Sequence, residues 1–108
     1  MAKNTAPKKE KTYIFHSDPG HGWLAVKEKE LIELNIAHEI SAYSYHKGQT
    51  VYLEEDRDAS IFIEALAAKG REFKHRSSYQ ERTPIRSYPS YEAPQEVLGE
   101  NNEKLDFA

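Results

Sequence analysis

YSYHKGQTVYLEEDRDASIFIEALAAKG, residues 43–70, contains the two clearest structural signals in the sequence. Residues 43–45 alternate aromatic and polar side chains, and residues 50–54 are rich in the β-branched and aromatic types that favour strands. The four residues between them, 46–49, include a glycine and are typical of a turn. We therefore expect a β-hairpin here.

A helix is expected directly after the hairpin. Asp56 or Asp58 should cap its N-terminus, because a carboxylate can accept the unpaired amide N–H groups of a first turn. The helix should run to about Lys69, with Gly70 at the position after the C-terminus where glycine is favoured. Four apolar side chains recur at helical spacing and mark the side that should face the core: Ile61, Phe62, Ala65 and Leu66.

Towards the N-terminus, an aromatic and β-branched run at residues 13–16 predicts a first strand. Residues 17–20 then predict a tight turn, since Pro19 fixes its own φ angle and Gly20 and Gly22 allow positive φ. The chain should reverse its direction at this point.

Three further elements complete the expected fold. Residues 23–26 predict a second short strand or an extended lead into a helix, and residues 27–36 combine apolar residues with Lys and Glu as in a helix of two to three turns. Residues 72–75 predict a last strand. This order predicts an α+β fold, in which a small, mainly antiparallel or mixed sheet of four to five strands carries two helices.

The charges are segregated along the chain. The 108 residues have a net charge of −3, but residues 1–11 hold +3, residues 69–86 hold +4 and residues 92–108 hold −4. We expect residues 12–91 to form a single domain. Residues 1–11 should be a flexible basic leader, and residues 92–108 a disordered acidic tail with too few apolar residues to offset its ordering entropy.

Composition excludes several classes of protein. There are no cysteines, so a disulfide framework, thiol catalysis and cysteine-ligated metal sites are excluded. No stretch approaches the roughly 18 apolar residues that a spanning helix needs, and no early apolar run resembles a signal peptide. We expect a cytoplasmic protein that does not bind membranes, and no motif indicates a cofactor.

The most unusual cluster runs from His16 to Trp23 and holds two histidines and one aspartate around a glycine-rich turn. A catalytic interpretation makes His16 or His21 an acid or base that Asp18 orients. Two other interpretations stay open. The stretch can be a binding loop without catalysis, or a purely structural turn in which Trp23 anchors the core.

Two groups of residues are candidate metal ligands, and each has a simpler explanation. His16, Asp18 and His21, with His38 or His46, could supply the three or so converging ligands of a metal site, but their spacing matches no known ligand motif. Negative charge at the expected helix start is what a helix N-terminus favours, so we expect capping and no metal. The same carboxylates could otherwise bind Mg²⁺: Glu54, Glu55, Asp56 and Asp58.

Basic and aromatic side chains alternate towards the C-terminus. Arginine binds phosphate and tyrosine stacks on bases, so one interpretation is a nucleic-acid or nucleotide site. The other is a polar strand followed by a segment that wraps the domain with its tyrosines against it. The residues concerned are Arg71, Lys74, Arg76, Tyr79, Arg82, Arg86, Tyr88 and Tyr91.

Three motifs span most of residues 13–91: Tyr13-x-Phe15-His16-x-Asp18-Pro19-Gly20-His21-Gly22-Trp23-Leu24-x-Val26, Tyr43-Ser44-Tyr45 and Val51-Tyr52-Leu53-Glu54-Glu55-Asp56. In these motifs the chain resembles a family of small proteins of bacterial phages and plasmids. The resemblance implies an origin in a mobile element and an accessory role. It brings no established activity and therefore assigns no functional residues.

Our first hypothesis is a non-enzymatic protein that binds a bacterial host protein, by analogy with small proteins of mobile elements that occupy host surfaces, including those of defence systems. We expect a monomer or a weak homodimer. The alternatives are nucleic-acid or nucleotide binding through residues 71–91, and a small hydrolase or nuclease that uses His16, Asp18 and His21. The expected protein-contact surface, rich in aromatic side chains, comprises His16, Asp18, His21, Trp23, Tyr43, Tyr45 and Tyr79.

Overall fold

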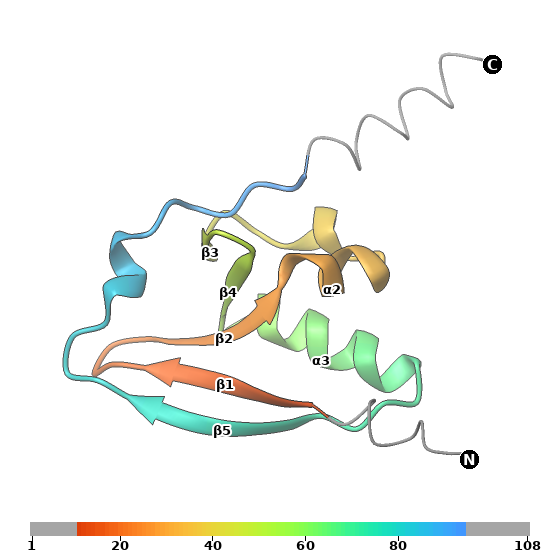
Figure 1. Ribbon diagram of the computed structural model, residues 1–108, viewed down its shortest axis with the longest axis horizontal. Helices are drawn as coiled ribbons and strands as arrows, with labels where there is room; N and C mark the ends of the chain where they lie inside the picture. The colour runs from red at the N-terminus through yellow and green to blue at the C-terminus, as the bar shows by residue number, and fades with distance from the viewer. Residues whose placement is uncertain (1–10, 95–108) are drawn as a thin grey trace.

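Alternation of apolar and polar residues builds one five-stranded mixed sheet in the computed structural model, which describes residues 11–94. The strands are β1 (Thr12–Ser17), β2 (Gly22–Lys27), β3 (Tyr45–Lys47), β4 (Thr50–Glu54) and β5 (Lys74–Tyr79). Their order across the sheet is β3-β4-β2-β1-β5, and only the β1–β5 pair is parallel (Figure 1). With two helices beside this sheet, the predicted α+β fold is confirmed.

One face of the sheet carries the core. Helix α3 (Asp58–Ala68) contributes Phe62 to it, and helix α2 (Glu28–Glu33) contributes Leu31, and both side chains are fully buried. Alternate strand residues meet them from the sheet: Tyr13, Leu24, Val26, Val51 and Leu53. The other alternate residues point to the opposite face, which we call the open face because neither α2 nor α3 covers it. Residues 80–94, with a 3-10 helix at Pro84–Ser87, lie over its part around Trp23 and Tyr52.

The predicted hairpin is present, but β3 starts at Tyr45 rather than at residue 43. The turn is formed at Gly48, whose φ of 61° suits glycine. Ser44 is fully buried and leaves the strand pairing because its hydroxyl donates to Asp58 Oδ2 at 2.6 Å and accepts the N–H of Glu54 at 3.0 Å.

The predicted helix cap is wrong in its residue. Glu54, at the end of β4, caps α3: its carboxylate accepts the N–H groups of Asp56, Arg57 and Asp58 at 2.7–2.8 Å. Asp58 instead points into the protein and accepts hydrogen bonds from the N–H and the hydroxyl of Ser41, at 3.0 and 2.7 Å. The end of α3 is as expected, with Gly70 in the left-handed region at φ 75°.

Two elements differ in length from their predictions. Helix α2 ends at Glu33, before the expected residue 36, because Asn35 takes a left-handed conformation at φ 60° and the helix cannot continue through it. Strand β5 begins at Lys74 and runs to Tyr79, beyond the expected residues 72–75, because it pairs with the whole of β1.

The glycines of the first turn serve a different purpose from the predicted one. Neither Gly20 nor Gly22 has a positive φ. Both are needed for their small size: a Cβ on Gly22 would collide with the Phe15 ring, and one on Gly20 would lie 2.9 Å from the guanidinium of Arg86. Close approach, rather than backbone conformation, explains glycine at these positions.

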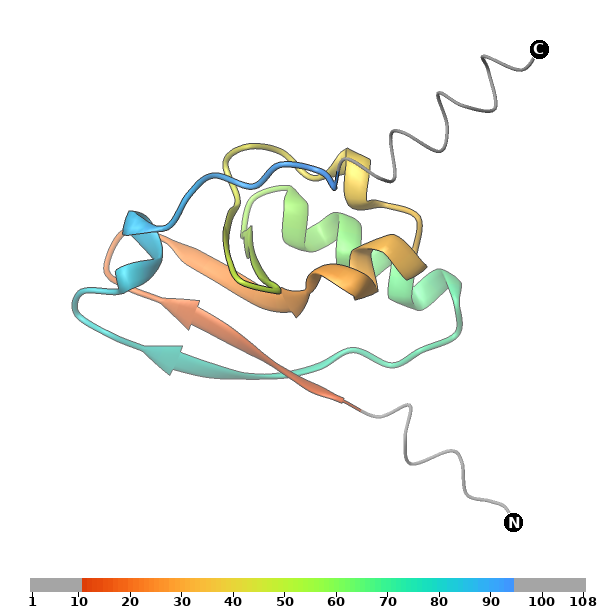
Figure 2. The same cartoon turned by 45° about the horizontal axis from the view of Figure 1, so that its top comes forward.

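After β5 the chain returns across the molecule to the neighbourhood of α2 (Figure 1), alongside the connection between α2 and β3 (Figure 2). Main-chain hydrogen bonds hold this return segment, residues 80–94, from His46 N–H to the Pro89 carbonyl and from Tyr91 N–H to the Ser44 carbonyl. The buried Tyr91 hydroxyl donates to the Ala37 carbonyl at 2.7 Å, and burial raises its pKa to about 12.

Ala93 still packs against the core, so the ordered contacts continue just past residue 91. Residues 1–10 and 95–108, which hold most of the predicted leader and acidic tail, lie outside the described residues, and both remain predictions. Within residues 11–94, no helix has the length and apolar character required to cross a membrane.

Asp58→Ala should lower the free energy of unfolding by about 3 kcal/mol, because the hydroxyls of Ser41 and Ser44 would lose their buried acceptor. Urea denaturation followed by Trp23 fluorescence measures this. Glu64→Ala, at an exposed position of the same helix, is the matched control and should change stability by less than about 0.5 kcal/mol. Equal effects of the two substitutions would contradict the central role of Asp58.

Candidate binding site

The buried carboxylate of Asp18 joins the β1–β2 turn to the return segment. Its Oδ1 accepts the main-chain N–H groups of Gly20 and His21, both at 3.0 Å. Arg86 binds it with two parallel hydrogen bonds, from Nε to Oδ2 at 2.7 Å and from Nη2 to Oδ1 at 2.9 Å. The Thr83 hydroxyl lies 3.3 Å from Oδ2. We call these residues the Asp18 cluster.

The Asp18 cluster fixes the charge state of its members. The Arg86 guanidinium, helped by the N–H donors of the turn, holds the pKa of Asp18 well below its usual range, and Asp18 raises the pKa of Arg86. A carboxylate in this state is a strong hydrogen-bond acceptor and a poor proton acceptor near neutral pH. Asp18 is therefore suited to hold the turn, and less suited to take part in acid–base chemistry.

His21 is oriented by Arg86 rather than by Asp18. Its Nδ1 lies 2.9 Å from Arg86 Nη2. Because a guanidinium can only donate, Nδ1 must accept this hydrogen bond, and the proton of the neutral ring is then on Nε2. In this arrangement His21 offers an N–H donor to a ligand, which gives the catalytic interpretation of His21 as a base no support.

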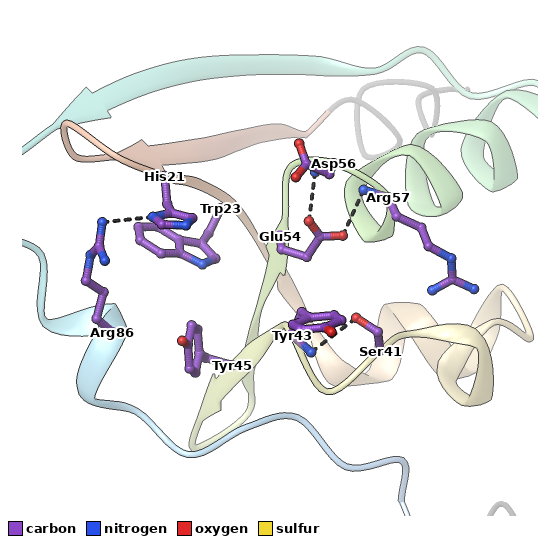
Figure 3. A pocket seen from close by; sticks show the side chains of 9 residues that line it. All are labelled: His21, Trp23, Ser41, Tyr43, Tyr45, Glu54, Asp56, Arg57 and Arg86. Carbon is purple, nitrogen blue, oxygen red and sulfur yellow. Dashed lines mark hydrogen bonds between the residues drawn. The ribbon is translucent and has the colours of Figure 1, made fainter.

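A pocket of about 640 Å³ opens beside this cluster (Figure 3). Trp23 and His21 line one side, with stacked rings whose centroids are 5.9 Å apart. Tyr45 meets Trp23 edge-on at 6.3 Å, and Tyr43 stands at the rim with 81% of its surface exposed. The complete lining is His21, Trp23, Ser41, Tyr43, Tyr45, Glu54, Asp56, Arg57 and Arg86.

Most charged groups around the pocket are engaged within the chain. Glu54 caps α3, Arg86 binds Asp18, and Arg57 donates to Asp58 Oδ1 at 3.1 Å and to the Glu39 carbonyl at 3.3 Å. Among the charged side chains of the lining, Asp56 is the one without a hydrogen bond or ion pair to another residue of the described chain. The pocket therefore presents mainly aromatic walls and few groups ready for chemistry.

Four of the seven residues predicted for the contact surface line this pocket: His21, Trp23, Tyr43 and Tyr45. Asp18 is not in the lining, but it holds Arg86, which is. His16 lies elsewhere on the open face, with its ring 5.8 Å from that of Tyr52, and burial together with the nearby Arg76 lowers its pKa. Tyr79 lies at the end of β5 on the helix side of the sheet, away from Tyr43.

Sequence reasoning did not place five of the lining residues in this site: Ser41, Glu54, Asp56, Arg57 and Arg86. The sequence marks Glu54 and Asp56 only as part of a carboxylate cluster at a helix start, and Arg86 only as one member of the basic and aromatic set of residues 71–91. Its partner Asp18 is 68 positions away, and no local pattern shows the pairing.

The predicted nucleic-acid set does not form one surface. Lys74 and Arg76 point to the open face, whereas Tyr79 is on the helix side. Arg86 belongs to the Asp18 cluster, and Tyr91 is buried with its hydroxyl on a main-chain carbonyl. This supports the second interpretation, a segment that wraps the domain, for the part after β5.

The candidate metal ligands are likewise separated or engaged. Among residues 11–94, no group of three or more histidine, aspartate or glutamate side chains is arranged to hold a metal ion. The carboxylates proposed for Mg²⁺ include Glu54 and Asp58, whose oxygens accept hydrogen bonds from the start of α3 and from the serines.

Comparison with protein-family models, with curated proteins and with solved structures finds no match for this chain. The assignment of a function therefore depends on the pocket and on the surfaces around it.

Asp18→Asn should lower the free energy of unfolding near neutral pH, and this difference from the wild type should shrink steadily below about pH 4. The native pKa is depressed, so the ionised carboxylate stabilises the fold above the unfolded-state pKa of about 3.9, and this contribution is lost as the pH falls towards the native value. Urea midpoints of both proteins from about pH 7 to about pH 2 test this.

Arg86→Gln provides the control for that experiment. When Asp18→Asn is introduced into a protein that already carries Arg86→Gln, the resulting loss of stability should depend far less on pH, since Arg86 is the main cause of the depressed pKa. A pH-independent effect of Asp18→Asn in the protein with Arg86 intact would contradict the assigned role of the cluster.

Proposed function

We propose that this protein is a binding module that recognises a partner protein through the aromatic pocket. The observation that carries the proposal is Tyr43: a large aromatic side chain, 81% exposed, at the rim of a preformed pocket of about 640 Å³. Tyrosine, tryptophan and arginine supply most of the strong contacts in protein interfaces. All three residue types meet at this pocket.

The state of the polar groups supports binding rather than catalysis. A reaction needs an acid, a base or a nucleophile that is free to act on a substrate. Here Asp18, Glu54 and Arg86 are held by hydrogen bonds within the chain, and His21 carries its available proton as a donor. A donor of this kind suits a carbonyl group of a bound polypeptide.

The pocket is also rigidly built. Ser41 Oγ accepts the main-chain N–H of Tyr43 at 3.2 Å, and the Ser41 side chain is itself held by Asp58. Trp23 on the other side is 2% exposed and packed by His21 and Tyr45. A site whose side chains are already ordered loses less conformational entropy on binding.

The partner that we propose is a bacterial host protein in the cytoplasm. The resemblance of the motifs around Asp18–Trp23 and Tyr43–Tyr45 to phage and plasmid proteins supports this choice, and the same motifs supply four of the pocket residues. The step from that resemblance to a host partner is analogy.

Tyr43→Ala should weaken partner binding by about 10- to 100-fold, because it removes an exposed aromatic contact. The partner is first captured from a bacterial lysate with the wild-type protein and identified by mass spectrometry, and its affinity for purified variants is then measured by calorimetry. Tyr79→Ala, which removes another exposed tyrosine from the far side of the sheet, is the matched control and should leave the affinity unchanged.

Loss of binding in Tyr79→Ala with full binding in Tyr43→Ala would place the interface elsewhere and overturn the proposal. A lysate that yields no stoichiometric protein under several conditions would also count against it. Thermal melting of both variants should match that of the wild type, since each substitution is at an exposed position.

A further inference from the structure

The open face of the sheet carries a second surface beside the pocket, whose walls include Trp23, Tyr45 and Glu54 of the same face. Strand pairing arranges its side chains in rows that cross the sheet. One row contains Arg76 of β5, Ile14 of β1, Ala25 of β2 and Tyr52 of β4, each opposite the next. The residues of this row are at least partly exposed, so a ligand can lie across the strands.

A basic row runs beside the first. Lys27 of β2, Thr50 of β4 and Lys47 of β3 are opposite one another, and Lys74 of β5 is opposite Thr12 of β1. Together with Arg76, these residues put four cations among the strand positions of the open face. The one acidic residue at those positions is Glu54, which lies at the pocket end and caps α3.

This local charge is opposite in sign to that of the chain, which has a net charge of −3. Arg76 forms no ion pair with any residue of the described chain, and its charge adds to the effect of burial in lowering the pKa of the nearby His16 imidazole. A face that collects cations while the whole protein is acidic attracts a polyanion to one place.

Aromatic rings lie between these cations. The rings of His16 and Tyr52 are 5.8 Å apart, and the ring of Tyr88, from the return segment, is 5.4 Å from that of Tyr52. The Lys47 ammonium lies 5.1 Å from the centre of the Tyr88 ring. All three rings are partly exposed. Aromatic side chains beside cations on a sheet surface are a platform on which unpaired bases stack.

We propose that the open face binds single-stranded nucleic acid, with phosphates along Lys27, Lys47 and Arg76 and bases against His16 and Tyr52. Unstacked bases are needed because the aromatic rings lie on a sheet, and neither α2 nor α3 is on this face to enter a groove of a duplex; the 3-10 helix there has only four residues. The surface differs from the predicted segment 71–91, since it takes residues from all five strands.

The test measures fluorescence anisotropy of labelled oligothymidylate and oligouridylate of about 12 nucleotides, and of a duplex of the same length. Binding to the single strands should be detectable at about 50 mM salt and should weaken as salt rises. Lys47→Ser with Arg76→Ser should weaken it at least about tenfold and reduce the steepness of the log–log salt dependence by about 1.4, since about 0.7 is lost per phosphate contact.

Two further variants separate this site from general charge effects and from simple anion binding. Lys69→Ser with Arg71→Ser removes the same charge from exposed positions just after α3, outside the proposed contact set, and should leave affinity nearly unchanged. Tyr52→Ile keeps a strand-forming apolar residue, and it should weaken binding at least about fivefold without changing the salt dependence.

Each contrary result overturns the proposal. Absence of binding at low salt, tighter binding to the duplex, or equal losses in the two double variants would show that the open face is not a single-strand site. Full binding by Tyr52→Ile, with heparin competing as well as the oligonucleotide, would show a plain anion surface. Tyr43→Ala should bind the oligonucleotides normally, so the result is independent of the proposed protein partner.

Discussion

The buried carboxylate of Asp58 is the constraint on which the rest of the structure depends. A charge that is fully removed from water must be hydrogen-bonded or the fold is strongly destabilised, and Asp58 meets this requirement with the N–H and hydroxyl of Ser41 and the hydroxyl of Ser44. These bonds draw the chain before β3 towards the start of α3, so Tyr43 is turned to the pocket rim instead of continuing the strand. Because Ser44 also accepts the N–H of Glu54, the same network reaches the residue that caps the helix.

A second buried aspartate, Asp18, has the equivalent role on the other side of the pocket. Its two hydrogen bonds to Arg86 bring the return segment against the β1–β2 turn, and the Arg86 guanidinium then lies 5.8 Å from the centre of the Trp23 ring while also donating to His21. Each wall of the pocket is therefore held by a carboxylate inside the protein. The polar residues whose types suggest chemistry are the ones that build the pocket, and the surfaces left for a ligand are mainly aromatic.

Features decided by neighbouring residues could be predicted from the sequence, and features decided by distant contacts could not. The hairpin, the apolar stripe of α3 and the left-handed Gly70 depend on local pattern, and they are present. The sequence predicts a cap at Asp56 or Asp58 because these residues are adjacent to the helix, whereas Glu54 reaches it only because β4 turns sharply into α3. The bounds of β5 depend on its pairing with β1, and the role of Arg86 depends on Asp18, so neither is visible in a short window. Of the unusual stretch from His16 to Trp23, His21 and Trp23 line the pocket, Asp18 holds the turn beside it, and His16 lies elsewhere on the open face.

The different uses of acidic and basic side chains explain how an acidic chain can present a basic face. Four carboxylates accept main-chain N–H groups: Asp18 in the first turn, Glu30 from Lys27, Glu54 at α3 and Asp58 from Ser41. Such hydrogen bonds place negative charge at turns and helix ends, where short acidic side chains fit and lysine or arginine cannot act as acceptors. Except where one binds a buried carboxylate, as Arg86 does at Asp18, the longer cationic side chains rarely fit inside a small domain, so most remain on positions that face outward. On the open face this leaves Lys27, Lys47 and Arg76 nearly unopposed, and net charge alone is a poor guide to what such a surface attracts.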